Sequence, residues 1–125
     1  MTIEKQVRNG VEIAVCHSDE IVISDVRSAL DFAMDTAYQT GCTNIAVNKA
    51  ALCRDFFILS TGLAGEIMQK FVNYHIRFAV IGDFSEFTSK PLRDFFCETN
   101  KGTHIFFVAS EAEAAEKFIR AAQMD

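Results

Sequence analysis

The sequence predicts an α/β domain in which a mostly parallel sheet is covered by about four helices. Short apolar segments typical of buried strands alternate with longer segments in which apolar residues recur at helical spacing. Near the N-terminus, Asn9-Gly10 stands between two alternating segments, as in a tight hairpin. The chain has 125 residues, half of them apolar, so we expect one domain over residues 1–125.

The first elements are predicted to form an antiparallel hairpin. Residues 2–8 and 11–16 alternate loosely between apolar and polar side chains, and both positions of Asn9-Gly10 tolerate the positive φ of a tight turn. After the hairpin, residues 21–23 are all apolar. This short segment either extends the sheet or fills one end of the core.

A helix is predicted over residues 25–40. Ser24 or Asp25 can cap its start, and Gly41 is typical of the left-handed residue that ends a helix. Its inward face is predicted to comprise Val26, Ala29, Leu30, Ala33, Met34 and Ala37. Residues 44–47 then form a short buried strand.

The stretch from Asn48 to Phe84 predicts a crossover unit. After an irregular start, a helix opens at Ser60-Thr61-Gly62. Its apolar face comprises Leu63, Ala64, Ile67, Met68, Phe71 and Val72. Residues 76–81 are apolar except Arg77 and too few for a helix, so we expect a buried strand. A helix that leads directly into a buried strand is half of a crossover in a parallel sheet.

The remaining elements are a helix, a strand and a last helix. Ser89 is the expected cap of the first of these helices, which ends at Gly102, and residues 105–109 form the strand. Ser110 and Glu113 have the spacing of a capping box. The inward side of the last helix is predicted to comprise Ala114, Ala115, Phe118, Ile119 and Ala122. Right-handed crossovers make the later strands parallel, and their order in the sheet stays open.

The composition argues against several classes of protein. The net charge is -5 and the basic residues are scattered, whereas a nucleic-acid site needs a concentrated positive surface. The longest run without charge, residues 56–65, is about half the length of a membrane span, and the N-terminus lacks the apolar core of a signal peptide. We therefore expect a cytoplasmic protein with no membrane contact. The four cysteines lie far apart without zinc-ligand spacing, so we expect reduced thiols and no metal site.

Polar residues follow the ends of two predicted parallel strands, where ligand sites of open α/β sheets gather. Asn48 and Lys49 follow one strand, and Asp83, Ser85 and Lys90 follow the next. We expect these residues at one end of the sheet. They form either a small-ligand site or a solvated rim.

The start of the central helix is the other candidate site. Ser60, Thr61 and Gly62 either cap this helix or, with its free N–H groups, hold an anion such as a phosphate. The adjacent Phe pairs are expected to be core, or core plus a contact to a partner. The nucleophile elbow Gly-x-Ser-x-Gly and a Gly-rich phosphate loop are absent from the sequence, so no catalytic residue and no cofactor is predicted.

Three segments of the chain carry a family resemblance. They are DFFILSTGLAGEIMQKFVNY, IGDFSEFTSKPLRDFF and ETNKG. These segments resemble the uncharacterised bacterial family called domain of unknown function 4180, and the resemblance covers nearly the whole chain. It implies no activity, because the family is defined by sequence alone.

A more distant resemblance concerns the order of elements. A hairpin followed by helix, strand, a helix opened by Ser-Thr-Gly-Leu, strand, helix, strand and helix is similar to the order in STAS domains. These domains form bacterial anti-sigma factor antagonists and the tails of sulfate transporters. In the antagonists the corresponding helix opens with Asp-Ser-Ser-Gly-Leu, and a partner kinase phosphorylates the first serine. The resemblance implies that Ser60 holds the phosphorylated position and Thr61 the next, whereas Leu59 replaces the Asp.

The function expected from these features is protein binding. We expect a non-enzymatic, STAS-like regulatory module that docks a signalling or kinase-like partner through the surface around Ser60 and Thr61. One alternative is a small-ligand or phosphate-ester binding protein, or an enzyme, with a site at the carboxyl ends of the strands. The residues of that site are Asn48, Lys49, Asp83, Ser85 and Lys90. Another is a homodimer whose interface contains exposed Phe84 and Phe87.

Overall fold

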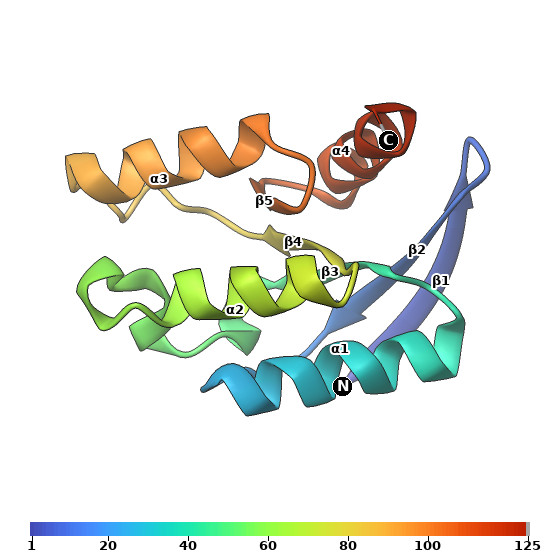
Figure 1. The fold of residues 1–125 in the computed structure, drawn as a ribbon, viewed down its shortest axis with the longest axis horizontal. Helices are drawn as coiled ribbons and strands as arrows, with labels where there is room; N and C mark the ends of the chain where they lie inside the picture. The colour runs from blue at the N-terminus through green and yellow to red at the C-terminus, as the bar shows by residue number, and fades with distance from the viewer. Residues whose placement is uncertain (125) are drawn as a thin grey trace.

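Within residues 1–124, which the computed structural model describes, five strands form one sheet in the order β1-β2-β3-β4-β5 (Figure 1). β1 and β2 form the antiparallel hairpin, and the later neighbours are parallel. The strands are β1 Thr2–Arg8, β2 Val11–His17, β3 Asn44–Asn48, β4 Arg77–Ile81 and β5 Ile105–Val108. The predicted α/β class is confirmed, and the strand order, which stayed open, is sequential.

Four helices of the described chain cover the sheet, three on one face and one on the other. They are α1 Val26–Thr40, α2 Leu63–Asn73, α3 Lys90–Lys101 and α4 Glu111–Met124. The right-handed crossovers through α1, α2 and α3 all advance in one direction, so these helices share a face. α4 follows the last strand and folds onto the opposite face, where its buried residues belong to a separate hydrophobic layer. None of these helices combines the length and apolar character needed to cross a membrane.

The central strands alternate between two hydrophobic layers. Ile45 and Val47 of β3 belong to the layer under α1 and α2, while Ala46 belongs to the layer under α4. Ala46 and Ala79, whose side chains are small, are buried in the layer under α4. The buried residues of α4 are Ala114, Ala115, Phe118 and Ala121.

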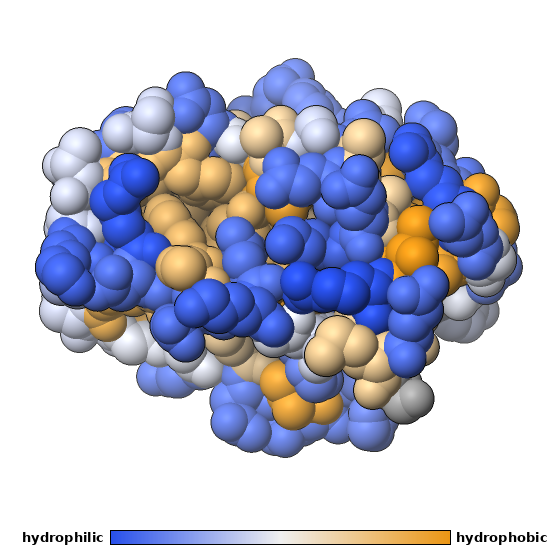
Figure 2. All heavy atoms as spheres, turned by 90° about the horizontal axis from the view of Figure 1, so that it is seen from above, coloured by the Kyte–Doolittle hydropathy of each residue, from blue (hydrophilic) through white to orange (hydrophobic). Residues whose placement is uncertain are grey.

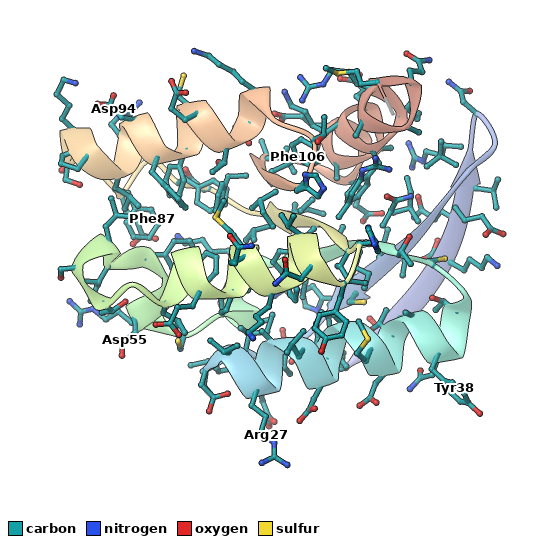
Figure 3. All side chains as sticks on the ribbon, viewed as in Figure 1. Arg27, Tyr38, Asp55, Phe87, Asp94 and Phe106 are labelled. Atoms are coloured by element: carbon teal, nitrogen blue, oxygen red, sulfur yellow. The ribbon has the colours of Figure 1, made fainter. Side chains whose placement is uncertain are left out.

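One predicted inward residue of α4 is misplaced. Ala122 is exposed, because the buried stripe continues through Ala121 instead. Phe118 meets Phe106 of β5 edge to face, with ring centroids 5.8 Å apart. Figure 3 shows Phe106 beside α4.

The hairpin and the start of α1 follow the predicted turn and cap chemistry. Asn9 and Gly10 have φ values of 52° and 78°, so both positions of the turn are left-handed. Asp25, the second of the two predicted caps, accepts a hydrogen bond from the N–H of Ser28 at 2.7 Å. Ile23 does not extend the sheet. It forms an isolated bridge with Leu52, and its buried side chain fills one end of the core.

The start of α2 differs from the prediction. Three short 3-10 turns precede it, namely η1 Lys49–Ala51, η2 Arg54–Phe57 and η3 Leu59–Thr61. Gly62 separates η3 from α2 with a left-handed φ of 75°, so α2 begins at Leu63 rather than at Ser60. The predicted inward face of α2 is correct at Ala64, Ile67 and Phe71, with Leu63 and Met68 partly buried, whereas Val72 is 39% exposed.

Aromatic side chains fill the space between α2 and α3. α1 packs against α2, whereas α3 packs beside β5, and rings from both regions meet between them. The rings that contact one another there are Phe56, Phe57, Phe84, Phe87, Phe95, Phe96 and Phe107. Figure 3 shows Phe87 between α3 and the turns before α2. Phe84 and Phe87 are half-buried in this cluster, not exposed as the predicted dimer interface required.

Candidate functional site

A crevice opens at the carboxyl ends of β4 and β5, where the connections from the two strands diverge. After β4 the chain turns to α3 on one face of the sheet, and after β5 it turns to α4 on the opposite face. Adjacent strand ends whose connections leave in opposite directions open a gap, and ligand sites of open α/β sheets lie in such gaps. β2, β3 and β4 all lead to helices on one face, so among the described strands this divergence occurs once.

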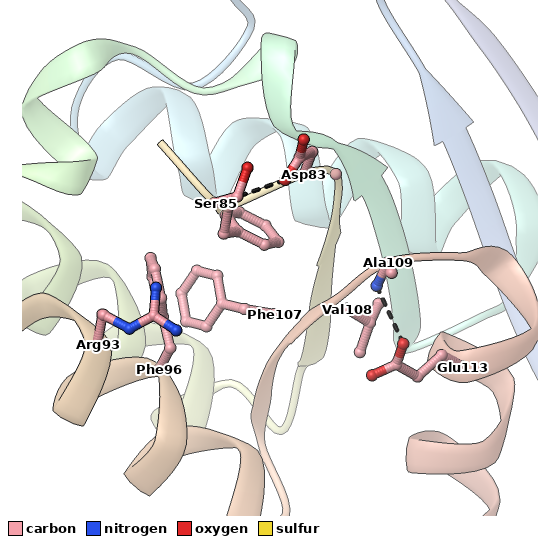
Figure 4. Close-up of a pocket in the computed structure, with 10 residues that line it drawn as sticks. Asp83, Ser85, Arg93, Phe96, Phe107, Val108, Ala109 and Glu113 are labelled. Atoms are coloured by element: carbon pink, nitrogen blue, oxygen red, sulfur yellow. Dashed lines mark hydrogen bonds between the residues drawn. The ribbon is translucent and has the colours of Figure 1, made fainter. Parts of the chain in front are cut away.

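The crevice has a volume of about 570 Å³ and is lined by both connections. Residues 82–85 come from the loop after β4, residues 107–109 and Glu113 from the end of β5 and the start of α4, and Arg93 and Phe96 from α3 (Figure 4). Seen from the side on which α3 and α4 lie, apolar atoms occupy a hollow framed by hydrophilic residues (Figure 2). A cavity of this size is within the range of small-molecule sites.

The floor of the crevice is aromatic. Phe107 is only 4% exposed, and the ring centroids of Phe96 and Phe84 lie 4.5 Å and 5.7 Å from its own. Phe84 and Phe96 are half-buried and 5.2 Å apart, so part of each ring faces the opening. Because each ring packs against the other two, the apolar floor is formed before any ligand arrives.

Charged side chains stand on the rim of the crevice. Arg93 of α3 and Glu113 of α4 lie on opposite sides of Phe107 (Figure 4). The guanidinium of Arg93 donates a long hydrogen bond of 3.4 Å to the carbonyl of Phe87, and it has no ion-pair partner within residues 1–124. The Glu113 carboxylate accepts from the N–H of Ala109 at 3.1 Å. The rim is therefore positive on the α3 side and negative on the α4 side.

The contact between Glu113 and Ala109 also corrects the predicted capping box of α4. The N–H of Glu113 donates to the hydroxyl of Ser110 at 3.1 Å, as expected. The carboxylate of Glu113 reaches Ala109 rather than Ser110. This one-residue shift holds the carboxylate at the end of β5, where it lines the crevice.

Asp83 adds a second carboxylate. Its Oδ1 accepts from the N–H of Ser85 at 2.9 Å. This backbone hydrogen bond, aided by the hydroxyl of Ser85, lowers the pKa of Asp83 below its ordinary value of 3.8. Asp83 is thus ionised at neutral pH and is a weak base.

Lys49 ties the loop after β4 to the end of β3. Its Nζ donates to the carbonyl of Asp83 at 2.9 Å, pairs with Glu86 and lies 4.9 Å from the ring centroid of Phe87. The Lys49 ammonium is therefore engaged within the protein. A second cavity of about 570 Å³ lies near this loop, but Lys49 and Glu86 neutralise each other on its rim.

Two other predicted residues lie outside the crevice. Asn48 exchanges two hydrogen bonds with the backbone of Ser18, accepting at 2.8 Å and donating at 2.7 Å, which fastens the end of β2 to β3. Lys90 is exposed and pairs with Asp94 one turn further along α3, at 2.7 Å. Of the predicted strand-end residues, the fold thus brings Asp83 and Ser85 into the crevice.

Ser60, Thr61 and Gly62 form the turn before α2. The Thr61 hydroxyl lies 2.8 Å from the carbonyl of Ile58 and 2.9 Å from that of Asp55, and it accepts from the N–H of Leu63 at 3.2 Å. Thr61 therefore binds the first N–H of α2 from the preceding 3-10 turn, while Gly62 is the N-cap residue. Ser60 is exposed, and its hydroxyl makes no hydrogen bond to any residue that the structure describes.

The described residues contain no cluster that could hold a metal ion, because no three of their His, Cys, Asp or Glu side chains lie close enough together. All four cysteines are free thiols, as expected. Cys16 and Cys42 are buried, and burial raises the pKa of Cys16 to about 11.

Comparison with known proteins gives a family. The model of a family described as a domain of unknown function, DUF4180, matches residues 8–118. The chain belongs to the DUF4180 family. Searches of the curated proteins and of the solved structures returned no match. The first of the two resemblances seen in the sequence is thereby confirmed.

The DUF4180 match contains the whole crevice, from Gly82 to Glu113, and the turn at Ser60. The family description names no activity, so the chemistry of this DUF4180 chain has to be argued from its own side chains.

Sequence reasoning missed Arg93, Phe96, Phe107 and Glu113 as parts of a site. Glu113 was interpreted as a helix cap and the Phe residues as core, and both interpretations are correct as far as they go. The missing information was which face α4 covers. Only that choice makes the loops after β4 and β5 diverge and brings these side chains to one opening.

Proposed function

We propose that this DUF4180 protein binds a small organic molecule in the crevice between the ends of β4 and β5. The observation that carries the proposal is the divergence of the two connections, which opens a cavity of about 570 Å³ over an aromatic floor. Sites of this kind combine apolar walls, which bury the ligand, with a few charged groups, which orient it. Asp83, Arg93 and Glu113 supply those charges.

The proposal is binding rather than catalysis. Ser85 is the one hydroxyl among the lining residues, and no histidine lies among them. Asp83 is next to Ser85, but the lowered pKa of Asp83 makes it a poor acceptor of a proton from a hydroxyl at neutral pH.

A thermal-shift screen of small organic compounds tests this function. A ligand at a hundred times its Kd adds about 2.7 kcal/mol to the free energy of unfolding. Ala109 lines the crevice and is exposed, so Ala109→Trp should fill the opening. Ala112, which is exposed in the first turn of α4 and does not line the crevice, provides the matched control Ala112→Trp.

Compounds that bind in the crevice should stabilise the wild type and Ala112→Trp but not Ala109→Trp. Equal stabilisation of all three proteins would place the ligand elsewhere. A broad screen in which no compound stabilises the wild type would contradict the proposed function.

Protein docking around Ser60 is the second candidate, and a specific observation favours it. Ile58 is 39% exposed and Leu59 is 37% exposed, and both flank the exposed Ser60. A phosphate on Ser60 would add nearly two negative charges beside these apolar side chains and would repel an apolar partner surface. The STAS-like order of elements supports this regulatory function.

The test of docking should change Ser60 alone. Thr61→Glu would remove the hydroxyl that binds the N–H of Leu63 and both carbonyl contacts, so any loss of binding could reflect local unfolding. Tagged Ser60→Glu, Ser60→Ala and wild-type proteins are compared in host lysate. The docking hypothesis expects a partner that wild type and Ser60→Ala retain and Ser60→Glu loses; identical sets on all three baits would contradict it.

A further inference from the structure

We propose that the ligand of the crevice is a zwitterion with a flat apolar body, whose anionic group meets Arg93 and whose cationic group meets Glu113. This inference rests on the proposed function and adds the chemical class of the ligand. It follows from three features of the crevice: the separation of its charged side chains, the hydrogen-bonding groups that these side chains leave unused, and the arrangement of the aromatic rings in its floor.

The charges of the rim are separated by the aromatic floor. Arg93 projects from α3 on one side of Phe107, and Glu113 projects from α4 on the other (Figure 4). The two side chains form no ion pair with each other. A ligand in the crevice therefore meets a positive group at one end and a negative group at the other.

Most N–H donors of the Arg93 guanidinium make no hydrogen bond to the described residues. The guanidinium donates one hydrogen bond to another described residue, the 3.4 Å bond to the carbonyl of Phe87. The planar guanidinium carries five N–H donors and matches a carboxylate in a two-pronged pair. An anionic group at the α3 end of the crevice would satisfy these donors.

Glu113 is held in place with one oxygen unused. Oε2 accepts from the N–H of Ala109 at 3.1 Å, and Oε1 accepts from no donor within residues 1–124. Asp83 also lines the crevice, from the loop after β4, and its Oδ1 accepts from the N–H of Ser85 at 2.9 Å. The unused oxygen of Glu113 can accept from an ammonium group, which can donate up to three hydrogen bonds.

Other charge types fit less well. A phosphate or another simple anion would be attracted by Arg93 but repelled by Asp83 and Glu113. A simple cation would leave the Arg93 guanidinium facing it. A neutral apolar compound would cover the floor and desolvate the rim charges without pairing them, which is unfavourable. A zwitterion pairs with both ends at once.

The floor favours a flat body. Phe96 and Phe107 are inclined at 44°, and Phe84 and Phe107 at 90°, so the floor consists of rings in different orientations. A flat ring can stack on one of them while meeting another edge to face. A saturated ring of the same length cannot form these contacts.

Four matched probes test the class of ligand. They are 4-(aminomethyl)benzoate, which is flat and zwitterionic; 4-methylbenzoate, which lacks the cation; benzylamine, which lacks the anion; and trans-4-(aminomethyl)cyclohexanecarboxylate, a zwitterion that is not flat. Kd values are measured by NMR titration, following the amides of Ser85 and Ala109. The flat zwitterion should bind at least about tenfold more tightly than either singly charged probe, and more tightly than the saturated one.

Two charge-neutralising variants then show which side chain binds which charged group of the ligand. Glu113→Gln keeps a carbonyl oxygen for the N–H of Ala109 and removes the charge, so the zwitterion should lose its advantage over 4-methylbenzoate. Arg93→Gln should instead remove its advantage over benzylamine. Far-ultraviolet circular dichroism confirms that both variants are folded.

The outcomes separate the inference from the proposed function. If the four probes bind in the crevice with similar Kd, or if the variants do not change the ranking of the probes, the inference of a zwitterionic ligand is wrong. The proposed function of ligand binding then still stands. If none of the four moves the crevice amides, the zwitterion is also wrong. The broad thermal-shift screen then decides whether the crevice binds another class of compound or none.

Discussion

Gly82 is the residue at which the shape of the crevice depends on a missing side chain. A Cβ at position 82 would lie 2.7 Å from Cβ and 3.1 Å from Cδ of Lys49. The Lys49 stem cannot retreat easily, because its Nζ is bound to Asp83 and Glu86. The glycine thus lets the loop after β4 close against β3 and hold Asp83 at the rim.

Substitution of two glycines by alanine should have opposite effects. Gly82→Ala should lower the free energy of unfolding by about 1–3 kcal/mol, because it overpacks against Lys49. Gly65 lies in α2 with nothing within 4 Å of an added Cβ, so Gly65→Ala should raise it by about 0.5–1 kcal/mol. Urea unfolding of both variants measures the difference; a stabilising Gly82→Ala would refute the close approach.

The four cysteines should differ in their rates of thiol labelling. Cys97 is exposed and Cys53 half-buried, whereas Cys16 and Cys42 are buried. Burial raises the pKa of Cys16 to about 11, so its thiolate is scarce at neutral pH. A thiol-reactive dye should label Cys97 first, Cys53 more slowly, and the two buried cysteines only after unfolding. Loss of the fast phase in Cys97→Ser is the control, and rapid labelling of Cys16 would contradict its burial.

Local residue roles could be predicted when the partner is near in sequence. The caps Asp25 and Ser89 follow from neighbours three residues away. The partners of Asn48 and Lys49 could not be predicted, because Ser18 and Glu86 lie 30 and 37 positions away and only the folded sheet brings them close.

At the scale of the helix, the capping carboxylate of α1 should make stability depend on pH. The N–H of Ser28, followed by its hydroxyl, lowers the pKa of Asp25 below 3.8. The folded state therefore binds this proton less readily than the unfolded state. The stabilising effect is present above about pH 4 and is lost as the pH falls through the lowered pKa.

The variant Asp25→Asn isolates this effect, because Asn also caps helices but does not titrate. Urea unfolding at about pH 6 and about pH 3 should show a larger loss of stability for the wild type than for the variant. Equal pH dependence of the two proteins would rule out Asp25 as the titrating cap.

A side chain of α3 binds the outer edge of β5. Asn100 of α3 accepts from the N–H of Phe107 at 2.7 Å and donates to its carbonyl at 3.0 Å. These bonds occupy backbone groups that could otherwise pair with another chain. Asn100→Ala should lower the free energy of unfolding by about 1–3 kcal/mol, because it leaves both groups unpaired.

Asn73→Ala is the matched control for that loss, since Asn73 is exposed on α2 and its side chain bonds only to Gln69 within the described chain. Its effect should stay within about 0.5 kcal/mol. Equal effects in the two variants, measured by urea unfolding, would show that Asn100 does not protect the edge.

The predicted elements were correct where periodicity determines them and wrong where the chain turns. The range of α1 was predicted to within one residue, because both of its ends carry clear signals, whereas Met34 of its predicted inward face is exposed. The start of α2 was placed too early, because Ser60 and Thr61 resemble a helix cap although they belong to a separate 3-10 turn.

At the scale of the whole molecule, the crevice depends on a choice that no local pattern encodes. The crossover rule predicts the face of α1, α2 and α3 once the strand order is known. The face of α4 depends instead on the match between its alanine stripe and the small residues Ala46 and Ala79 on the far side of the sheet. That match makes the connections diverge, and it becomes visible only in the folded sheet.

The most direct test of the crevice as a ligand site is a protein-observed NMR screen with a diverse set of small fragments. Backbone amides report where each fragment binds. The structure predicts that the largest shift changes fall at residues 82–85 and 107–113, on the two connections that diverge after β4 and β5. Changes concentrated at residues 58–61, or no saturable change from any fragment, would contradict ligand binding in the crevice.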